Sequence, residues 1–265
     1  MPEGDTVHKL AAYLARRLAG EVLGSVRVHR RPVRALERQP IASIEPHGKH
    51  LLIRWNSGLQ IRVHLGMYGS WHRYPRGAEW HKPPAQAAVE LWTNQQVYIC
   101  FNAKEVELSR TGSHDTTGLE MRVGPDLLDA ATDPALPAER VLDLCSPDAS
   151  IAEALLDQRI ASGIGNVYKS EVLFIERQNP FVPARGIGRA TLMQLFHTAR
   201  DLLAGNLGGG PRHTRAAERG GSQLWVYGRH GRACLRCRTP VRVCRHGAGR
   251  RSTYWCPTCQ ATRAG

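Results

Sequence analysis

The chain has 265 residues, of which 42% are hydrophobic, and carries a formal net charge of +13 from 36 Lys and Arg against 23 Asp and Glu. This length allows about one to three folded domains with cores of their own. No apolar run approaches the roughly 20 residues needed to cross a bilayer, and the N-terminal stretch lacks the apolar region of a secretory signal. We therefore expect a cytoplasmic protein without a membrane partner. The positive charge favours a polyanionic partner such as nucleic acid, although a genome rich in arginine codons would also raise it.

The first half of the chain predicts one helix followed by β-structure. Apolar residues recur at helical spacing from Val7 to Leu18, with a cap expected at Asp5 or Thr6. From about residue 21 to residue 108 the pattern changes to short alternating runs separated by turn signals. Short strands at such close spacing are typical of a β-sandwich or a barrel.

The second half predicts helices and a connector. Helical patterns cover residues 151–160, 167–178 and 188–205. Residues 206–222 are rich in Gly and Arg and break this pattern, so we expect them to link the helices to the C-terminal segment.

Residues 221–265 form a strongly basic segment with nine arginines and no Asp or Glu. Four of its cysteines have the spacing C-x2-C-x18-C-x2-C, which is typical of a four-thiolate zinc site. Two disulfides in an exported protein are the alternative, but a cytoplasmic compartment keeps thiols reduced. Four thiolates leave no open position for water, so we expect one structural Zn²⁺ and no organic cofactor. The predicted ligands are Cys234, Cys237, Cys256 and Cys259.

Two further positions are candidate phosphate contacts. Gly163 and Gly165 form a tight connection between two predicted helices and place Asn166 at the N-cap of the second, where free backbone N–H groups attract phosphate. An ordinary helix–helix turn with a good cap is the alternative. Lys49 is one of only five lysines and precedes an apolar strand, although alone it would be a solvated charge at a strand end.

Together these patterns predict an α+β multidomain chain in three parts. We expect an N-terminal β-sandwich domain with a leading helix (residues 1–125), a helical domain (residues 126–220) and a C-terminal four-cysteine β-hairpin (residues 221–265). The hairpin lies between the two cysteine pairs and carries Arg250 and Arg251 near one end. Nothing in the sequence indicates more than a monomer.

The chain resembles the Fpg/Nei family of bifunctional DNA glycosylases over nearly its whole length. Seven landmarks carry the resemblance and occur in the family's order: MPEG, GKHLLI, HLGMYGSW, VGPDLL, LLDQRIASGIGNVYKSEVLF, VYGRHGRACLRC and RRSTYWCPTCQ. The resemblance implies an N-terminal β-sandwich, a helix–two-turn–helix DNA-binding domain and a zinc finger. It also implies damaged double-stranded DNA as the partner, with single-stranded and bubble DNA as open alternatives, and a nucleoid-associated location.

The resemblance assigns four catalytic residues. Pro2, freed by removal of Met1, would supply a secondary amine that attacks the deoxyribose C1′ and forms a Schiff base. Glu3 matches the general acid that protonates the sugar ring oxygen. Lys49 matches a lysine that contacts phosphate beside the lesion, and Arg251 matches the finger arginine that grips phosphate and assists the second elimination.

Four further residues are expected to contact DNA. Asn166 matches the asparagine that binds the DNA backbone, and Arg122 matches an arginine of the endonuclease VIII branch. An enzyme of this kind turns the damaged nucleotide out of the stack and fills the space that it leaves. Met67 and Tyr68 are the candidate wedge for that purpose, and packing inside the sandwich is the alternative for both.

The lesion class is predicted from one absent segment. The purine-lesion branch carries a DPRRFG segment, whereas this chain reads CFNAKEVELSR at residues 100–110. Together with the MPEGDT start, this difference favours the endonuclease VIII branch, oxidised pyrimidines as preferred substrates, and strand nicking by β,δ-elimination. Two alternatives stay open: a glycosylase of oxidised purines (formamidopyrimidine or 8-oxoguanine) with the same fold, and a non-catalytic protein that binds damaged DNA.

Overall fold

The computed structural model describes residues 2–111, 123–133, 135–216 and 221–261. They fall into two compact units, Met1–Met121 and Arg122–Gly265, each with a core of its own. The expected boundary between residues 220 and 221 falls inside the second unit and stays a prediction. No helix in the described ranges is long and apolar enough to span a membrane.

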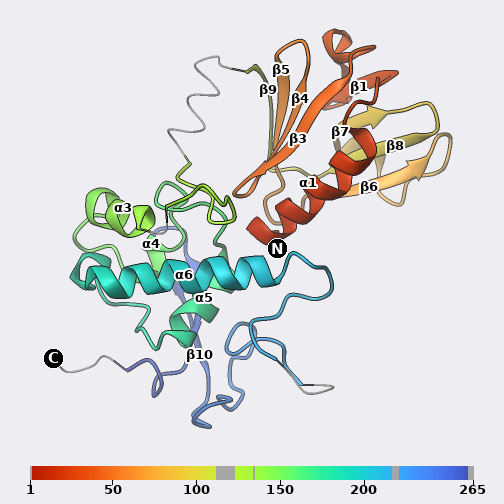
Figure 1. Ribbon diagram of the computed structural model, residues 1–265. Coiled ribbons are helices and arrows are strands. Elements are labelled where there is room, and N and C mark those ends of the chain that lie inside the picture. Colours follow the sequence, from red (N-terminus) through yellow and green to blue (C-terminus); the bar gives the residue numbers. More distant parts are fainter. Residues whose placement is uncertain (1, 112–122, 134, 217–220, 262–265) are drawn as a thin grey trace. The chain divides into compact units, whose positions relative to one another are not determined.

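The first unit is a β-sandwich of two antiparallel sheets with a leading helix, as the sequence predicts (Figure 1). One sheet has the strand order β2-β1-β7-β8-β6, and the other has the order β3-β4-β5-β9. The elements are α1 (Gly4–Leu18), β1 (Ser25–Val28), β2 (Arg31–Pro32), the 3-10 helix η1 (Arg34–Leu36), β3 (Ile41–His47), β4 (His50–Trp55), β5 (Leu59–His64), β6 (Ser70–Pro75), the 3-10 helix η2 (Pro84–Gln86), β7 (Ala87–Trp92), β8 (Gln96–Phe101) and β9 (Glu105–Arg110).

The core of this unit combines one face of α1 with residues from both sheets. Leu14 and Leu18 of α1 are fully buried, because their spacing places them on the same face of the helix. Val89 of β7, Ile53 of β4 and Val63 of β5 are also fully buried in this cluster. Burying a side chain of this size contributes roughly 1.5–3 kcal/mol, so this cluster stabilises the sandwich.

Helix α1 begins earlier than the sequence predicts. Its N-cap is Glu3, whose extended backbone (φ −126°) lets its carbonyl accept hydrogen bonds from the backbone N–H of Thr6 (3.0 Å) and Val7 (3.1 Å). The expected caps, Asp5 and Thr6, instead lie in the first turn, where a carboxylate faces the positive end of the helix dipole. The helix therefore starts directly after Glu3.

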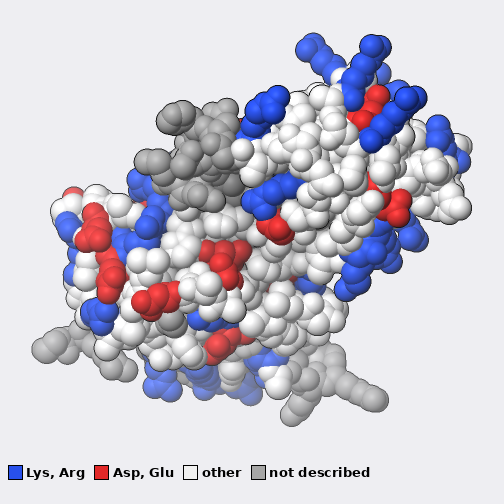
Figure 2. All heavy atoms as spheres, turned by 45° about the horizontal axis from the view of Figure 1, so that its top comes forward, with Lys and Arg blue, Asp and Glu red and all other residues white. Residues whose placement is uncertain are grey.

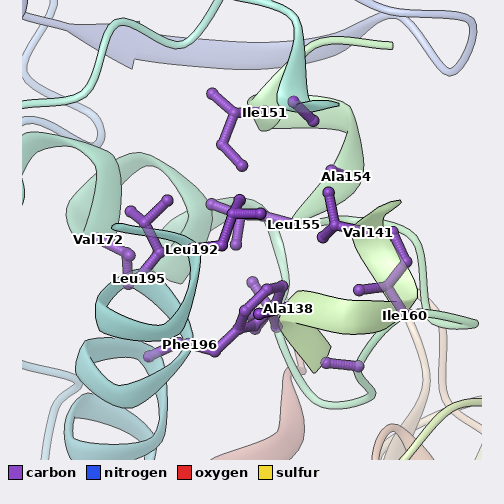
Figure 3. Packing of buried hydrophobic residues seen from close by; sticks show 14 of the residues in the cluster. Ala138, Val141, Ile151, Ala154, Leu155, Ile160, Val172, Leu192, Leu195 and Phe196 are labelled. Atoms are coloured by element: carbon purple, nitrogen blue, oxygen red, sulfur yellow. The ribbon is translucent and has the colours of Figure 1, made fainter. Parts of the chain in front are cut away.

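The second unit has a helical core with a β-hairpin attached to it. Its elements are α3 (Leu136–Leu144), α4 (Ile151–Ala154), α5 (Asn166–Ile175), the 3-10 helix η3 (Ala184–Gly186), α6 (Arg189–Gly205), β10 (Arg242–His246) and β11 (Arg251–Trp255). Figure 3 shows Leu192 and Phe196 of α6 packed among apolar side chains of α3, α4 and α5.

Two helices of this unit differ from the prediction. The helix expected over residues 151–160 ends at Ala154. The reason is local: the Asp157 carboxylate accepts a hydrogen bond from the backbone N–H of Arg159 (3.0 Å) and also binds its guanidinium, which favours a turn over a helix. Helix α3 was not predicted from the sequence.

Strands β10 and β11 form the predicted hairpin, with Val243 opposite Tyr254 and His246 opposite Arg251. A small second core attaches this segment to α5, because Phe174 of that helix is buried against it. The cluster consists of Phe174, Val226, Cys234, Val241 and Cys256. The helical and four-cysteine segments therefore share apolar contacts within one unit.

Candidate active site and nucleic-acid interface

Pro2 and Glu3 stand at the start of α1. Pro2 is half-buried, and Glu3 is completely buried. The free N–H groups and the dipole of a helix start create positive potential at this point. Such a potential disfavours a protonated amine. The position therefore suits an unprotonated amine beside a carboxyl group.

Lys49 lies in the two-residue turn between β3 and β4. The preceding Gly48 has a φ of 55°, a conformation that favours glycine. His47 and His50 pair across the turn, and β5 brings His64 beside His50, with their ring centroids 4.8 Å apart. Sheet register thus places Lys49 at the end of a strand pair that carries several imidazoles.

His50 is neutral in this environment. Burial, followed by the nearby His64 and Arg62, lowers the pKa of His50 to about 3. Arg62 Nη1 donates a hydrogen bond to His50 Nδ1 at 3.0 Å, which requires an unprotonated Nδ1 because a guanidinium has no acceptor. Burial lowers the pKa of His64 as well. Burial therefore favours the uncharged imidazole of both His50 and His64 beside the turn that carries Lys49.

Met67 and Tyr68 occupy an exposed turn between β5 and β6. Their side chains are 51% and 76% exposed, which excludes the alternative that both pack inside the sandwich. Two glycines shape the turn. Gly66 has a φ of 64°, and a Cβ on Gly69 would lie 2.3 Å from the carbonyl oxygen of Leu65. The backbone geometry therefore displays an apolar and an aromatic side chain to solvent.

The sequence predicts Asn166 at the N-cap of α5, but in the structure Asn166 is the first residue of the helix. The cap is Gly165, whose backbone is extended (φ −119°). The Asn166 side chain is 7% exposed, and its Nδ2 donates to the carbonyl of Ser252 at 2.7 Å. Lys169 is completely buried one turn later, and its Nζ donates to Asn166 Oδ1 and to Thr253 Oγ1, both at 2.8 Å. These bonds connect the start of α5 to strand β11.

Arg251 is exposed at the first position of β11. It pairs with His246 across the hairpin and follows Arg250, which has a φ of 44°. The next residue, Ser252, is the one whose carbonyl accepts the Asn166 amide. Asn166 and Arg251 therefore lie on adjoining segments of the same unit.

Sequence reasoning missed two buried charged residues of α5, Lys169 and Glu171. The Glu171 carboxylate accepts the backbone N–H groups of residues 225–227 at 2.7–2.9 Å and the hydroxyl of Thr214. Lys and Glu are almost never fully buried unless they are paired. Their position inside the apolar stretch VYKSEVLF was the available signal.

The four predicted cysteine ligands lie together. Their sulfur atoms are all within 4.8 Å of one another, with Cys234 and Cys259 at 3.9 Å and Cys237 and Cys256 at 3.4 Å. Ligands about 2.3 Å from a tetrahedral zinc would be about 3.8 Å apart, so the group fits a metal ion. Hydrogen bonding to Thr239 lowers the pKa of Cys237 to about 6, whereas burial raises the pKa of Cys256 and of Cys259. All seven cysteines, each within the described residues, are free thiols, so the disulfide alternative is wrong.

One expected DNA contact, Arg122, lies outside the described residues. The others are divided between the two units. The first unit carries Pro2, Glu3, Lys49, Met67 and Tyr68, and the second carries Asn166, Arg251 and the four cysteines.

Comparisons with known proteins agree on the family. The Formamidopyrimidine-DNA glycosylase N-terminal domain matches residues 1–107, and the Formamidopyrimidine-DNA glycosylase H2TH domain matches residues 123–215. "Probable endonuclease 8 2" of Streptomyces coelicolor is 40% identical over 268 residues, which cover 98% of this chain and 94% of that protein. The "DNA-(apurinic or apyrimidinic site) lyase Nei2" of Mycolicibacterium smegmatis is 36% identical over 262 residues, covering 98% and 99%.

A solved structure shares the architecture. The MutM (Fpg) protein of Thermus thermophilus superimposes with a TM-score of 0.78 at 27% identity, covering 99% of this chain and 100% of that one. A β-sandwich with a leading helix, a helical core and a four-cysteine hairpin is thus the architecture of a formamidopyrimidine-type DNA glycosylase. The chain belongs to this family, the Fpg/Nei family, and the resemblance inferred from its sequence is confirmed.

Proposed function

We propose that the chain is a base-excision-repair DNA glycosylase with AP lyase activity, which removes oxidised bases and nicks the strand by β,δ-elimination. The placement of Pro2 beside the buried Glu3 at the start of α1 is the observation that carries this proposal. Family membership supports it, because relatives named endonuclease 8 and DNA-(apurinic or apyrimidinic site) lyase match almost the whole chain.

Pro2 is the proposed nucleophile once Met1 has been removed. An α-amino group ordinarily titrates near pH 8, and the positive end of α1 favours its unprotonated form. The nitrogen lone pair forms a bond to C1′ while the bond to the damaged base breaks and its electron pair leaves with the base. The proton that the amine nitrogen then loses neutralises the departing base. Glu3 then delivers a proton to the sugar ring oxygen, and ring opening leaves a cationic iminium.

Lys49 and Arg251 are proposed to act on the phosphates. The iminium acidifies the C2′ proton, whose removal expels the 3′ phosphate, and a second elimination expels the 5′ phosphate. Lys49 would neutralise the phosphate beside the lesion, and Arg251, exposed at the start of β11, would bind the leaving phosphate through its guanidinium fork.

Four residues are proposed to hold the DNA. Asn166, at the start of α5, and Arg122 would contact the backbone. Met67 and Tyr68 would enter the stack in place of the extruded nucleotide, and their exposure on a glycine-shaped turn supports this role. Damaged double-stranded DNA is therefore the proposed partner, and single-stranded or bubble DNA is the alternative.

Oxidised pyrimidines are the proposed substrates. The endonuclease 8 names of several relatives support this choice, as does the absence of a DPRRFG segment at residues 100–110. Oxidised purines are the second candidate, because the formamidopyrimidine-DNA glycosylase of Thermus thermophilus is 32% identical over 98% of the chain.

The four cysteines are proposed to hold one structural Zn²⁺. A closed four-thiolate site would stabilise the hairpin that carries Arg251 and would leave no position for a metal-bound water. We further propose that the chain works as three domains with boundaries near residues 125 and 220, and that it acts in the cytoplasm at the nucleoid.

Borohydride trapping tests the chemistry. The protein is mixed with one duplex that contains an abasic site and another that contains 5-hydroxyuracil, and the cross-linked residue is located by mass spectrometry. We expect a reduced adduct on Pro2 with both duplexes. An adduct with the abasic duplex alone would support the amine mechanism and would favour oxidised purines over oxidised pyrimidines as the substrates.

A matched control carries an uncleaved N-terminal extension, which converts the Pro2 amine to an amide. It should bind the same duplexes but form no adduct. If a chain shown by its intact mass to begin at Pro2 also forms no adduct, the catalytic assignment is wrong and a damaged-DNA-binding protein remains.

A further inference from the structure

A dense group of arginines follows strand β1, on the β1–β2 hairpin and the short segment after it. We call Arg30, Arg31, Arg34 and Arg38 the arginine hairpin. All four side chains are exposed. Among the described residues, no carboxylate forms an ion pair with any of them. The neighbouring Arg27 differs, because it lies 3.8 Å from the carboxylate of Glu90.

The backbone under these side chains is well ordered by hydrogen bonds to the sheet. His29 N donates to the carbonyl of Ala88 (2.8 Å), Val33 N donates to Val26 (2.8 Å), and Arg38 N donates to Leu23 (3.0 Å). Leu36, the last residue of η1, is fully buried and anchors the segment to the core. The four guanidinium groups therefore project from a fixed platform and not from a loose loop.

Two of the arginines occupy strained backbone positions. His29 (φ 47°) and Arg30 (φ 67°) form the two-residue turn between β1 and β2, and Arg38 has a φ of 59°. Such turns favour Asn-Gly, and a non-glycine residue in the left-handed region costs roughly 1–3 kcal/mol. Both positions therefore hold an arginine at a conformational cost.

The arginine hairpin lies away from the catalytic end of the same unit. Helix α1 has 15 residues and so separates its two ends by roughly 22 Å. Arg38 pairs with Leu23, just beyond the C-terminal end of that helix. In Figure 1 the chain's N-terminus marks one end of α1 and β1 lies past the other. Figure 2 shows Lys and Arg side chains gathered at that outer end of the unit.

We propose that the arginine hairpin binds the phosphate backbone of duplex DNA at a second surface, separate from the site around Pro2. Guanidinium groups match phosphate oxygens in two-point hydrogen bonds. Residues 27–38 expose no large hydrophobic side chain, so the surface lacks the apolar centre of a typical protein interface. The partner class rests on the proposed function, because an enzyme that searches DNA meets undamaged duplex in great excess.

This second surface would retain the enzyme on DNA without reading its sequence. Phosphate contacts carry no base information, and their strength falls steeply with salt. Contact through the arginine hairpin leaves the Pro2 end of α1 unoccupied, so a bound enzyme would still be able to engage a lesion.

Protection of a sheet edge is the competing explanation. β2 is the edge strand of its sheet and contains Arg31 and Pro32, two residues that prevent edge-to-edge pairing. Arg34 and Arg38 lie outside that strand, so edge protection leaves them unexplained. Aggregation of a variant with unchanged DNA affinity is the outcome that this explanation predicts.

The test uses the full chain with the substitutions R30N, R31Q, R34Q and R38N. Asparagine tolerates the left-handed region better than arginine, so the variant should fold at least as well as the parent. The control, R16Q/R17Q/R73Q/R76Q, also removes four exposed arginines from the first unit. Both variants lower the net charge from +13 to +9, four charges fewer. The affinity for an undamaged duplex is measured over a range of salt concentrations.

We expect the arginine-hairpin variant to bind a duplex of about 30 base pairs roughly tenfold more weakly, and the slope of log K against log salt to fall by about 2–4. The control should change the slope by less than about 1. Single-turnover cleavage of an abasic duplex at saturating enzyme should stay within about twofold of the parent, since Pro2 precedes one end of α1 and the arginine hairpin lies past the other.

Equal loss in both variants, or no loss in either, would overturn the proposal. If the four-residue variant has a much lower melting temperature than the parent, R34Q/R38N tests the same surface outside the turn. The slope of log K against log salt should then fall by about 1–2. Binding of undamaged duplex needs no chemistry. If the parent forms no borohydride adduct, the proposed function is refuted. If the arginine-hairpin variant nevertheless binds undamaged duplex more weakly than the parent, the proposed second surface still stands.

Discussion

The two units of the molecule hold their candidate functional side chains in different ways. In the first unit three of these residues lie at the edges of an apolar core: Pro2 at a helix start, Lys49 after a glycine turn, and Tyr68 on an exposed loop, whereas Glu3 is buried. In the second unit a buried charged side chain, Lys169, connects the segments that carry Asn166 and Arg251 by hydrogen bonds to Asn166 and Thr253.

In the first unit, a substitution of an exposed functional side chain should change activity with little effect on stability. In the second unit, substitutions in the segments that carry Asn166 and Arg251 should change both. An exposed side chain on a glycine-shaped turn contributes little to folding. A buried carboxylate that accepts several backbone N–H groups is costly to alter, because each group that loses its partner keeps its desolvation penalty. Glu171 is such a carboxylate. Changes in the two units should therefore have distinct consequences.

Removal of the metal should have the largest effect. Structural zinc contributes about 10 kcal/mol or more to the folding of isolated fingers. Chelation, or C256S, should therefore melt the cluster around Phe174 and Val226 while strands β4 and β5 stay folded. Hydrogen exchange resolved by peptide measures both regions, and metal analysis of the untreated protein should give one zinc per chain. Equal exchange in the hairpin with and without metal would contradict the structural role.

Glu171→Gln should have the next largest effect. The neutral amide loses charge-assisted hydrogen bonds to residues 225–227 and presents donors to existing donors, so we expect a loss of about 2–4 kcal/mol in unfolding free energy. Chemical denaturation monitors the change. Glu139→Gln is the matched control, because that side chain is 51% exposed in its ion pair with Arg189, and it should cost less than about 1 kcal/mol. Similar losses in both variants would remove the distinction between the units.

Acid should destabilise the first unit through His50. Its pKa is about 3 in the fold against 6.5 for an ordinary histidine. Between these values the unfolded chain binds a proton that the folded unit does not bind, so stability falls as pH decreases from 6.5 toward 3. The contribution is up to about 1.4 kcal/mol per pH unit. His50→Gln should flatten the dependence of unfolding free energy on pH in this window. An unchanged slope would show that His50 is not the group responsible.

Tyr68→Ala should have the smallest effect on stability. The side chain is 76% exposed, so the unfolding free energy should change by less than about 0.5 kcal/mol. Excision of 5-hydroxyuracil should decrease more than cleavage at an abasic site, which has no base to extrude. Thermal melting and the two cleavage rates check this prediction. A large drop in melting temperature would place Tyr68 in the folding core after all.

Much of the fold could be predicted from the sequence, because the signals were local. Helical spacing located α1, α5 and α6, and alternation indicated the sandwich. Errors occurred where a single side chain or backbone angle decides the outcome. Asp157 ends α4 early by binding Arg159, and Gly165 takes the cap position expected for Asn166.

The sequence by itself determined the candidate cysteine ligands, because these depend on residue type and spacing along the chain. Its resemblance to the Fpg/Nei family supplied the family and the candidate catalytic residues. Only the tertiary structure decided that Lys169 reaches Thr253, 84 positions away, and that Glu171 binds residues 225–227. It also decided that four arginines project from one platform. Contacts between distant segments depend on how cores and sheets pack, and the local spacing of residues does not predict that packing.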